Sequence, residues 1–343
     1  MRLRFALVFI AAICSTIARP QFAVASTYTT FNMPGSCSAG VPTGINRWGS
    51  VTGYYAPCEE VTASGFLYQS NGTVTTFSAP KARSTYPMSI SGTGWIVGYY
   101  SDAEGVFHGF LRNPKYTTLD VPGAGTKGDQ GTQALSINDA GQVAGIYIDS
   151  QSVGHGFIWQ SDTGTFTTFD IPGGNGVTGA LLNQAGQVAG TYTTQGSITQ
   201  GNVSHGYIMQ TDGTITTFDP PNSIGTSVTG INGSGETTGY YSLSADTVQE
   251  FTSDQYGNVT TFNITGFFQN AGLEDSGDVL GTYESAARAH GWKRTAAGVV
   301  SYFSDPSAAG GLGTFSTCVS GNGKVAGLYY DSSGNTHDFV MTN

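Results

Sequence analysis

The sequence is poor in charged residues, and most of those it has are acidic. Only 10% of the 343 residues are charged, with 13 lysines and arginines against 23 aspartates and glutamates, and the formal net charge is −10. A surface of this sign repels phosphate backbones and anionic headgroups. The composition therefore argues against nucleic acid or an anionic membrane as the partner.

Long apolar runs are absent except at the very start of the chain. Arg2 and Arg4 precede an apolar stretch from Phe5 to about Ala18, and Ala23-Val24-Ala25 follows. This order predicts a secretory signal peptide over residues 1–25, and its loss takes the formal net charge to −13 because three arginines and no acid are removed. No later run approaches the roughly 20 residues that cross a bilayer, so we expect no membrane insertion. Residues 26–343 are expected to form one domain, secreted to the periplasm or the cell exterior.

Cysteine is also scarce. Cys37, Cys58 and Cys318 remain after the predicted cleavage. In an oxidising compartment an odd number allows one intramolecular bridge and leaves one thiol over.

Glycine and aromatic residues are abundant, with 50 glycines, 18 tyrosines and 19 phenylalanines, as in many short strands joined by tight turns. A Thr-Thr-Phe signature recurs at intervals of 41 to 50 residues. Its copies end at Phe31, Phe77, Leu119, Phe169, Phe218, Phe262 and Phe303. A period of this length indicates a repeat architecture.

Two further signatures recur in the same period. One is an aliphatic residue, a polar residue and a Gly-closed turn, best seen as Ile137 to Gly141, followed by a strand that carries a second glycine, at Gly53, Gly98, Gly145, Gly190, Gly239, Gly281 and Gly327. The other is His-Gly-Phe, with copies that begin at His108, His155, His205 and His290 and variants at Ser64, Gln249 and His337. Each unit therefore reads as four antiparallel strands. Strand A ends at the Asn, B carries the second glycine, C carries His-Gly-Phe, and D carries Thr-Thr-Phe.

The phase of the two ends decides the architecture. The mature chain begins with a lone strand D, 28–31, and finishes just after a lone strand C, 338–341. Joined, these ends complete a seventh unit, which removes the exposed edges that an open array would leave. The sequence predicts an all-β, seven-bladed β-propeller of four-stranded antiparallel blades, with the last blade closed by the N-terminal strand.

This topology also pairs the cysteines. The D-to-A and B-to-C connections emerge on one face of a propeller, and Cys37 and Cys58 lie in two such connections of the same blade. We therefore expect a Cys37–Cys58 disulfide. Cys318 falls inside a strand A and is expected to be a buried free thiol.

The His-Gly-Phe and Asn-x-x-Gly-Gln-Val-x-Gly elements, repeated along nearly all of the mature chain, resemble the bacterial extracellular repeat proteins of the HAF family, named for a His-Ala-Phe-like motif. Here glycine usually takes the place of the alanine, and Ser64, Glu250 and Asp338 depart from the motif. The resemblance implies an exported bacterial repeat protein. It implies little about a ligand, because members of the family mostly have no assigned activity.

The residues that could carry catalysis favour structural roles. The histidines occupy one equivalent strand C position in five blades, so they do not converge on one ion, and we expect them to bond to neighbouring backbone and pack between blades. Asp120, Asp170 and Asp219 follow strand D, where Asn and Ser substitute, which indicates a turn cap. Asn138-Asp139-Ala140-Gly141 has too few carboxylates in its other copies for a calcium cage. We predict no catalytic residue, no metal and no cofactor.

Aromatic residues give the positive indication of function. Tyrosine pairs such as Tyr54-Tyr55 and Tyr99-Tyr100 end strand B, where alternation sends one ring into the sheet packing and the other outward. With the longer loops they suggest a recognition face that comprises Lys81, Arg83, Tyr86, Lys127, Asp129, Phe267 and Phe268.

The leading hypothesis is a monomeric binding or scaffolding module for a carbohydrate or protein ligand, without catalysis. A polysaccharide-active hydrolase or lyase and a structural envelope protein are the alternatives, since propellers host all three.

Overall fold

A computed structural model describes residues 26–58, 60–195, 202–264, 267–285, 288–308 and 312–342. The predicted signal peptide, 1–25, lies outside these residues. Within them the regular structure is β-strand, apart from the short 3₁₀ turn η1 (Pro306–Ala308). No helix in the described part of the chain is long and apolar enough to span a membrane.

Each repeat unit forms one antiparallel sheet, which we call a blade. Blade 1 contains β2 (Val41–Ile45), β3 (Val51–Tyr55), β4 (Ser64–Tyr68) and β5 (Val74–Phe77); blade 2 contains β6 (Ser84–Ile90), β7 (Ile96–Ser101), β8 (Phe107–Asn113) and β9 (Lys115–Leu119); blade 3 contains β10 (Gly131–Ile137), β11 (Gln142–Ile148), β12 (Gly154–Gln160) and β13 (Thr165–Phe169). Blade 4 contains β14 (Gly176–Val177), β15 (Leu181–Leu182), β16 (Val188–Gln195), β17 (Asn202–Met209) and β18 (Ile215–Phe218); blade 5 contains β19 (Gly225–Ile231), β20 (Thr237–Ser244), β21 (Thr247–Ser253) and β22 (Val259–Phe262). Blade 6 contains β23 (Phe267–Leu273), β24 (Val279–Ser285), β25 (Arg288–Arg294) and β26 (Val300–Phe303), and blade 7 contains β27 (Thr314–Val319), β28 (Val325–Tyr330), β29 (Thr336–Thr342) and β1 (Thr27–Phe31).

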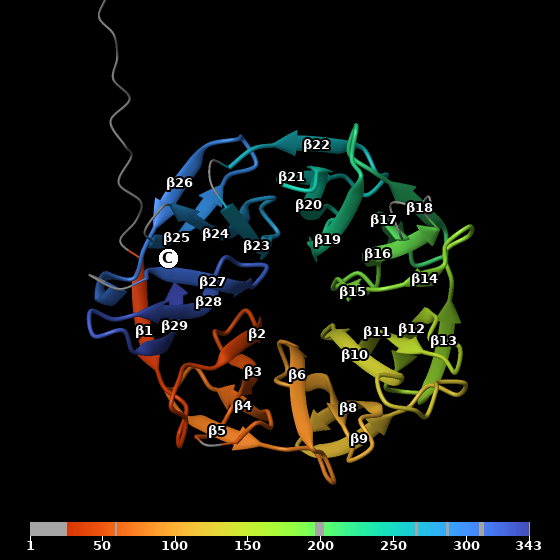
Figure 1. Cartoon of the computed structure of the whole chain (residues 1–343), viewed down its shortest axis with the longest axis horizontal. Coiled ribbons are helices and arrows are strands. Elements are labelled where there is room, and N and C mark those ends of the chain that lie inside the picture. The colour runs from red at the N-terminus through yellow and green to blue at the C-terminus, as the bar shows by residue number, and fades with distance from the viewer. Residues whose placement is uncertain are drawn as a thin grey trace, which may run out of the picture.

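The blades stand around a ring, with the A strands nearest its middle and the D strands at its rim (Figure 1). In blade 4 strand A is split into β14 and β15, which both pair with β16. Blades 2 and 3 are joined by a single parallel bridge between Phe107 and Gly131. The structure confirms the predicted all-β organisation in four-stranded antiparallel units.

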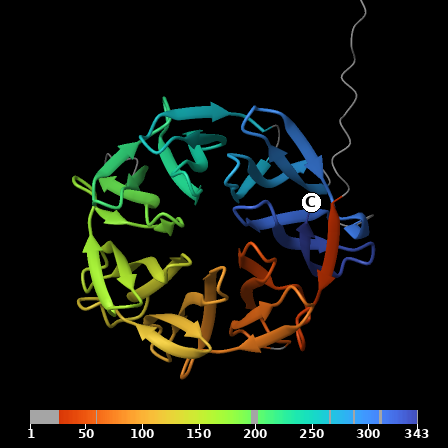
Figure 2. The ribbon, with the colours of Figure 1, turned by 180° about the vertical axis from the view of Figure 1, so that it is seen from behind.

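The two ends of the chain meet in blade 7. Strand β1 pairs with β29 over five residues, from Thr27 opposite Thr342 to Phe31 opposite Asp338. Figures 1 and 2 show the first strand, in red, beside the dark blue strands of the C-terminal blade. The ring is therefore closed by main-chain hydrogen bonds between the first strand and the last.

The repeat signatures are explained by packing inside each blade. The aromatic residue of His-Gly-Phe is almost fully buried in every blade, as Phe66, Phe110, Phe157, Tyr207, Phe251, Trp292 and Phe339. The glycine before it makes room for the last residue of strand D: a Cβ on Gly156 would overlap the ring of Phe169, and one on Gly206 would overlap that of Phe218. The two motifs thus recur together because each fits the other.

The repeated asparagine closes the A–B turn and also links neighbouring blades. The Oδ1 atom of Asn138 accepts from the N–H of Gln142 at 3.0 Å, which caps the turn as the sequence predicted. Its Nδ2 donates to the carbonyl of Asn183 at 3.2 Å, and Asn183 donates in turn to the carbonyl of Asn232 at 2.9 Å. One side chain therefore stabilises both a turn and an inter-blade contact.

The connections between strands emerge on two opposite faces of the ring. The loop face carries the D-to-A and B-to-C connections, such as 32–40, 78–83, 102–106 and 120–130. The hairpin face carries the A–B turns, such as 46–50 and 138–141, and the C–D turns, such as 69–73 and 254–258.

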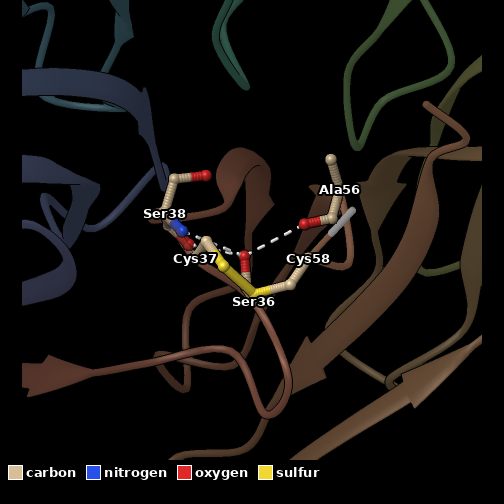
Figure 3. The surroundings of a disulfide bond; sticks show 5 residues. All are labelled: Ser36, Cys37, Ser38, Ala56 and Cys58. Atoms are coloured by element: carbon tan, nitrogen blue, oxygen red, sulfur yellow. Dashed lines mark hydrogen bonds between the residues drawn. A yellow bond between two sulfur atoms is a disulfide. The ribbon is translucent and has the colours of Figure 1, made fainter. Parts of the chain in front are cut away.

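Cys37 and Cys58 form a disulfide on the loop face, with 5.2 Å between their Cα atoms (Figure 3). Ser36 supports the same junction, since its hydroxyl donates to the carbonyls of Ser38 at 2.7 Å and Ala56 at 3.1 Å. Cys318 is a buried free thiol in β27, and burial raises the pKa of the thiol to about 12. The two loops of blade 1 are thus tied together where the chain enters the ring.

Replacing both Cys37 and Cys58 by serine is expected to lower the free energy of unfolding by about 3 kcal/mol, because the cross-link restricts the unfolded chain over a separation of 21 residues. Urea unfolding measures the loss. Wild-type protein in reductant serves as the matched control and should show the same loss, while the serine variant should not respond to reductant. A wild-type midpoint that reductant does not move would contradict the expectation.

Candidate functional site

The histidines of strand C are held by side chains on the loop face. Nδ1 of His155 lies 2.7 Å from Asp170, and Nδ1 of His205 lies 2.7 Å from Asp219. In other blades serine or asparagine takes the place of the aspartate. His290 pairs with Ser304 at 2.8 Å, and His337 pairs with Asn32 at 3.0 Å.

These contacts correct two predictions from the sequence. The histidines bond to side chains rather than to neighbouring backbone. Asp120, Asp170 and Asp219 serve as partners of those histidines rather than as turn caps. The exchange of Asp, Asn and Ser at this position follows from its role, because each of the three offers an oxygen to an imidazole N–H.

A second carboxylate and a tyrosine complete the environment of several histidines. Nε2 of His108 lies 3.3 Å from Asp102, and the ring stacks on Tyr100 with centroids 5.0 Å apart. Burial lowers the pKa of His108, but the hydrogen bonds and charges of Asp120 and Asp102 outweigh it and raise the pKa overall. Equivalent stacks join Tyr147 to His155, Tyr283 to His290 and Tyr329 to His337, whereas the rings of Tyr192 and His205 are tilted by 33°. Neighbouring side chains therefore hold these histidines in place within the blades.

Two carboxyl groups lie inside the blades instead of at a surface. Glu250 and Asp338 take the glycine position of His-Gly-Phe in blades 5 and 7, and both are fully buried. Asp338 Oδ2 accepts from the N–H of Gly40 at 2.8 Å, whereas neither oxygen of Glu250 has a hydrogen-bond partner among the described residues. Burial raises the pKa of Glu250 to about 9 and that of Asp338 to about 7.

Four aromatic rings form a continuous group across blades 1 and 2, toward the loop face. Tyr54 contacts Tyr86 edge to face at 5.3 Å, Tyr86 lies 5.2 Å from Tyr99, and Tyr99 contacts Phe107 edge to face at 5.4 Å. All four are partly exposed. Burial, followed by the neighbouring phenols, raises the pKa of Tyr54 and Tyr99, so the phenols stay neutral. We call Tyr54, Tyr86, Tyr99 and Phe107 the aromatic cluster.

The predicted charged residues lie in loops beside this cluster. Arg83 donates its N–H to the carbonyl of Ser101 at 2.8 Å, and Asp129 donates its N–H to the carbonyl of Gly105 at 3.0 Å. Lys81 and Asp129 adopt left-handed backbone conformations, with φ of 64° and 65°, that turn their loops sharply. The side chains of Lys81, Arg83, Lys127 and Asp129 are exposed. The two loops flank the strands of blade 2 that carry Tyr86 and Tyr99.

Phe267 and Phe268 do not join this group. They lie in β23 of blade 6, across the ring from β6 (Figure 1), and their side chains lie outside the described part of the structure. Phe107, in contrast, belongs to the cluster but was not predicted to be part of the recognition face. It directly precedes His108, and the repeat offers no shared residue at that position that could have singled it out.

No family model matches the sequence, and no curated protein matches it. Solved structures do resemble the fold. The β-propeller domain of the Trilobed protease from Pyrococcus furiosus has a TM-score of 0.64 at 10% identity, over 91% of this chain and 95% of that chain. Virginiamycin B lyase from Staphylococcus aureus has a TM-score of 0.60 at 11% identity, over 93% of this chain and 99% of that chain. At such identities the likeness shows the fold alone, and it confirms the predicted β-propeller.

Proposed function

We propose that this chain is an exported binding module that holds a glycan on its loop face and does not catalyse a reaction. The observation that carries the proposal is the aromatic cluster. Partly exposed tyrosine rings offer apolar faces for sugar rings and hydroxyls for their polar edges. The exposed side chains of Lys81, Arg83, Lys127 and Asp129 supply polar groups beside it, as recognition sites with a few placed polar groups do.

Export is supported by three independent features. The predicted signal peptide would direct the chain out of the cytoplasm, and a disulfide such as Cys37–Cys58 persists in an oxidising compartment. The HAF-like repeat points to the same location.

A hydrolase or lyase finds less support in the geometry. The histidines are spread one to a blade and are engaged by their neighbours, and Glu250 and Asp338 lie inside blades. Within the described ranges no group of three or more His, Cys, Asp or Glu is placed to hold a metal ion. One structural neighbour is a lyase whose histidine-to-alanine variant is described as catalytically inactive, and that property belongs to the neighbour.

The Tyr86→Ala variant is expected to lose about tenfold or more in affinity for glycans that the wild-type protein binds on an array, because Tyr86 is the central ring of the cluster. Isothermal titration with the best array ligand measures the change. Tyr302→Ala removes a 55% exposed ring from β26 in blade 6 and is the matched control.

The same polysaccharides are incubated with the protein and checked for new reducing ends or unsaturated products. Turnover would replace the proposal with the enzyme alternative. If the wild-type protein binds no glycan on the array, the proposal of a glycan ligand is wrong, and a protein ligand or a structural role in the envelope is left. Equal binding by Tyr86→Ala and wild-type protein would move the site away from the aromatic cluster.

A further inference from the structure

The middle of the ring contains a cavity of about 280 Å³ that opens toward the hairpin face. Its rim is formed by the A–B turns, one from each blade. The larger polar side chains of this rim are Arg47, Asp139, Gln184, Asp275 and Asn322. Its deeper walls are aliphatic, because strand A ends in an aliphatic residue in each blade. Those that line the cavity are Ile45, Ile90, Leu182, Ile231, Leu273 and Val319. A polar mouth therefore leads to aliphatic walls, which also line a second cavity of about 190 Å³.

The polar groups of the rim are held in place by neighbouring turns. The carboxylate of Asp139 pairs with the Arg47 guanidinium and accepts from the N–H of Gly92 at 2.5 Å, while the N–H of Asp139 donates to Gln184 Oε1 at 3.0 Å. Across the mouth, Asp275 Oδ1 accepts from the N–H of Gly233 at 2.9 Å. Both carboxylates are thus hydrogen-bonded within the rim. The lining contains one cationic side chain, Arg47, and two anionic ones, Asp139 and Asp275, so it has no excess of positive charge.

Trp48 departs from the repeat at this rim. The residue two positions after the turn asparagine or its equivalent is small or polar in the other blades: Thr93, Ala140, Ala185, Ser234, Ser276 and Asn322. In blade 1 it is Trp48, which is 62% exposed. Its indole N–H donates to the carbonyl of Gly92 at 3.0 Å, and the Arg47 guanidinium lies 5.5 Å from the ring centroid.

These contacts fix the indole beside the rim residues Arg47 and Gly92, next to the cavity lining but not part of it, while most of its surface stays in water. An exposed tryptophan that is held in one orientation gains little from burial, so its position is better suited to contact with a ligand than to stabilising the blade.

We propose that one neutral sugar ring binds at the rim of this mouth, where it stacks on Trp48 and directs its hydroxyl groups toward the polar lining. The cavity volume of about 280 Å³ is just below the usual range of ligand pockets, roughly 300–1,000 Å³, which suits a single ring rather than an extended chain. Hydroxyl groups match the mixed amide, carboxylate and guanidinium rim, and the apolar face of the ring matches the indole. The site lies on the opposite face from the aromatic cluster and does not depend on the glycan site proposed there.

Titration of the full chain with the methyl glycosides of glucose, galactose, mannose and N-acetylglucosamine tests the site through tryptophan fluorescence. Trp159 and Trp292 are buried, but Trp95 is partly exposed, so the titration is repeated on the Trp95→Phe variant, in which Trp48 dominates any change caused by a ligand at the surface. At least one glycoside is expected to give a saturable change in emission, with an affinity in the millimolar range.

Calorimetry with that glycoside compares the variants. Trp48→Ala is expected to bind about tenfold more weakly or worse, and Trp48→Phe should retain most of the affinity because it keeps an aromatic face. Tyr256→Ala, which removes a 71% exposed ring from a C–D turn of the same face, should bind as the wild-type protein does. Tyr86→Ala should also leave this affinity unchanged, which separates this site from the loop face.

Unaltered binding by Trp48→Ala would overturn the assignment, and so would the absence of saturable binding of all four glycosides to wild-type protein. Loss of glycoside binding in Tyr86→Ala but not in Trp48→Ala would place the sugar at the aromatic cluster instead. Thermal melts of each variant confirm that the fold is intact.

Discussion

The Glu250→Gln variant is expected to be more resistant to urea than the wild-type protein near pH 9 and to lose that advantage near pH 5. Glu250 is fully buried in β21, and neither carboxylate oxygen has a hydrogen-bond partner among the described residues. Burial raises the pKa of the carboxyl from its ordinary value of 4.5 to about 9, so the folded protein holds a proton that the unfolded chain has already released.

The sign of the effect follows from this difference in bound protons. Between about pH 4.5 and pH 9 the folded state binds more protons than the unfolded state, so the wild-type free energy of unfolding falls as the pH rises. Each pH unit in that window corresponds to about 1.4 kcal/mol, so the contribution lost between pH 5 and pH 9 is at most about 5 kcal/mol. Glutamine cannot ionise and removes this dependence.

Urea unfolding at several pH values, with the variant compared with wild-type protein at each, measures the effect. Comparison at each pH is needed because the buried Asp338, with a pKa of about 7, gives both proteins a further loss of stability between about pH 4 and pH 7. Glu104→Gln, at an exposed position, is the matched control. A constant difference between Glu250→Gln and wild-type protein from pH 5 to pH 9 would show that Glu250 is ionised in the folded state.

The Gly145→Ala variant is expected to lose about 4 kcal/mol or more of stability. Gly145 is the second glycine of the repeat and lies in β11, opposite a bulge in β10 between Ala134 and Ser136. A Cβ there would overlap the carbonyl oxygen of Gln133 and would also meet the ring of Phe157 at 2.8 Å. Backbone and a buried ring cannot both move aside without disrupting the blade.

Thermal unfolding of Gly145→Ala against wild-type protein checks the size of the loss. Gly179→Ala is a suitable control, because its Cβ would meet nothing closer than the N atom of Thr191 at 3.8 Å and should be tolerated. Near-wild-type stability of Gly145→Ala would mean that the bulge is softer than its geometry indicates. The equivalent glycines at 53, 98, 190, 239 and 327 face the same kind of carbonyl, so the explanation holds for six of the seven copies.

The architecture could be predicted because its determinants are periodic. The turn residues and the strand glycines repeat with the period of the blades, and the two half-units at the ends of the chain complete one further unit. Backbone geometry requires each of these features. The contact between Cys37 and Cys58 follows from the same topology, since it requires only that two connections share a face. Local chemistry that recurs in every unit is visible in the sequence.

The surroundings of the histidines and the position of Trp48 were less predictable, because they depend on contacts that the repeat does not encode. The partner of His155 is Asp170, fifteen positions later, and only the register that sets Gly156 opposite Phe169 brings the two together. The sequence does contain one indication of the His–Asp pairing. In blade 1 both partners are replaced together, by Ser64 and Ser78, whose hydroxyl groups contact each other. Trp48 could not be predicted for the opposite reason, because it occurs in one unit and breaks the repeat instead of following it.

The pairing of β1 with β29 has a consequence for how the chain reaches its folded state. The five paired residues at each end are separated by almost the whole sequence, so their contact is among the least local in the molecule. During synthesis the first strand emerges long before its partner exists, and blade 7 stays incomplete until the final residues are free to fold. Until then the edges of β1 and of the growing array are open to pairing with other chains. The slowest productive step is therefore expected to be docking of the two ends, and a chaperone that shields the early strand would raise the yield more than one that acts on any single blade.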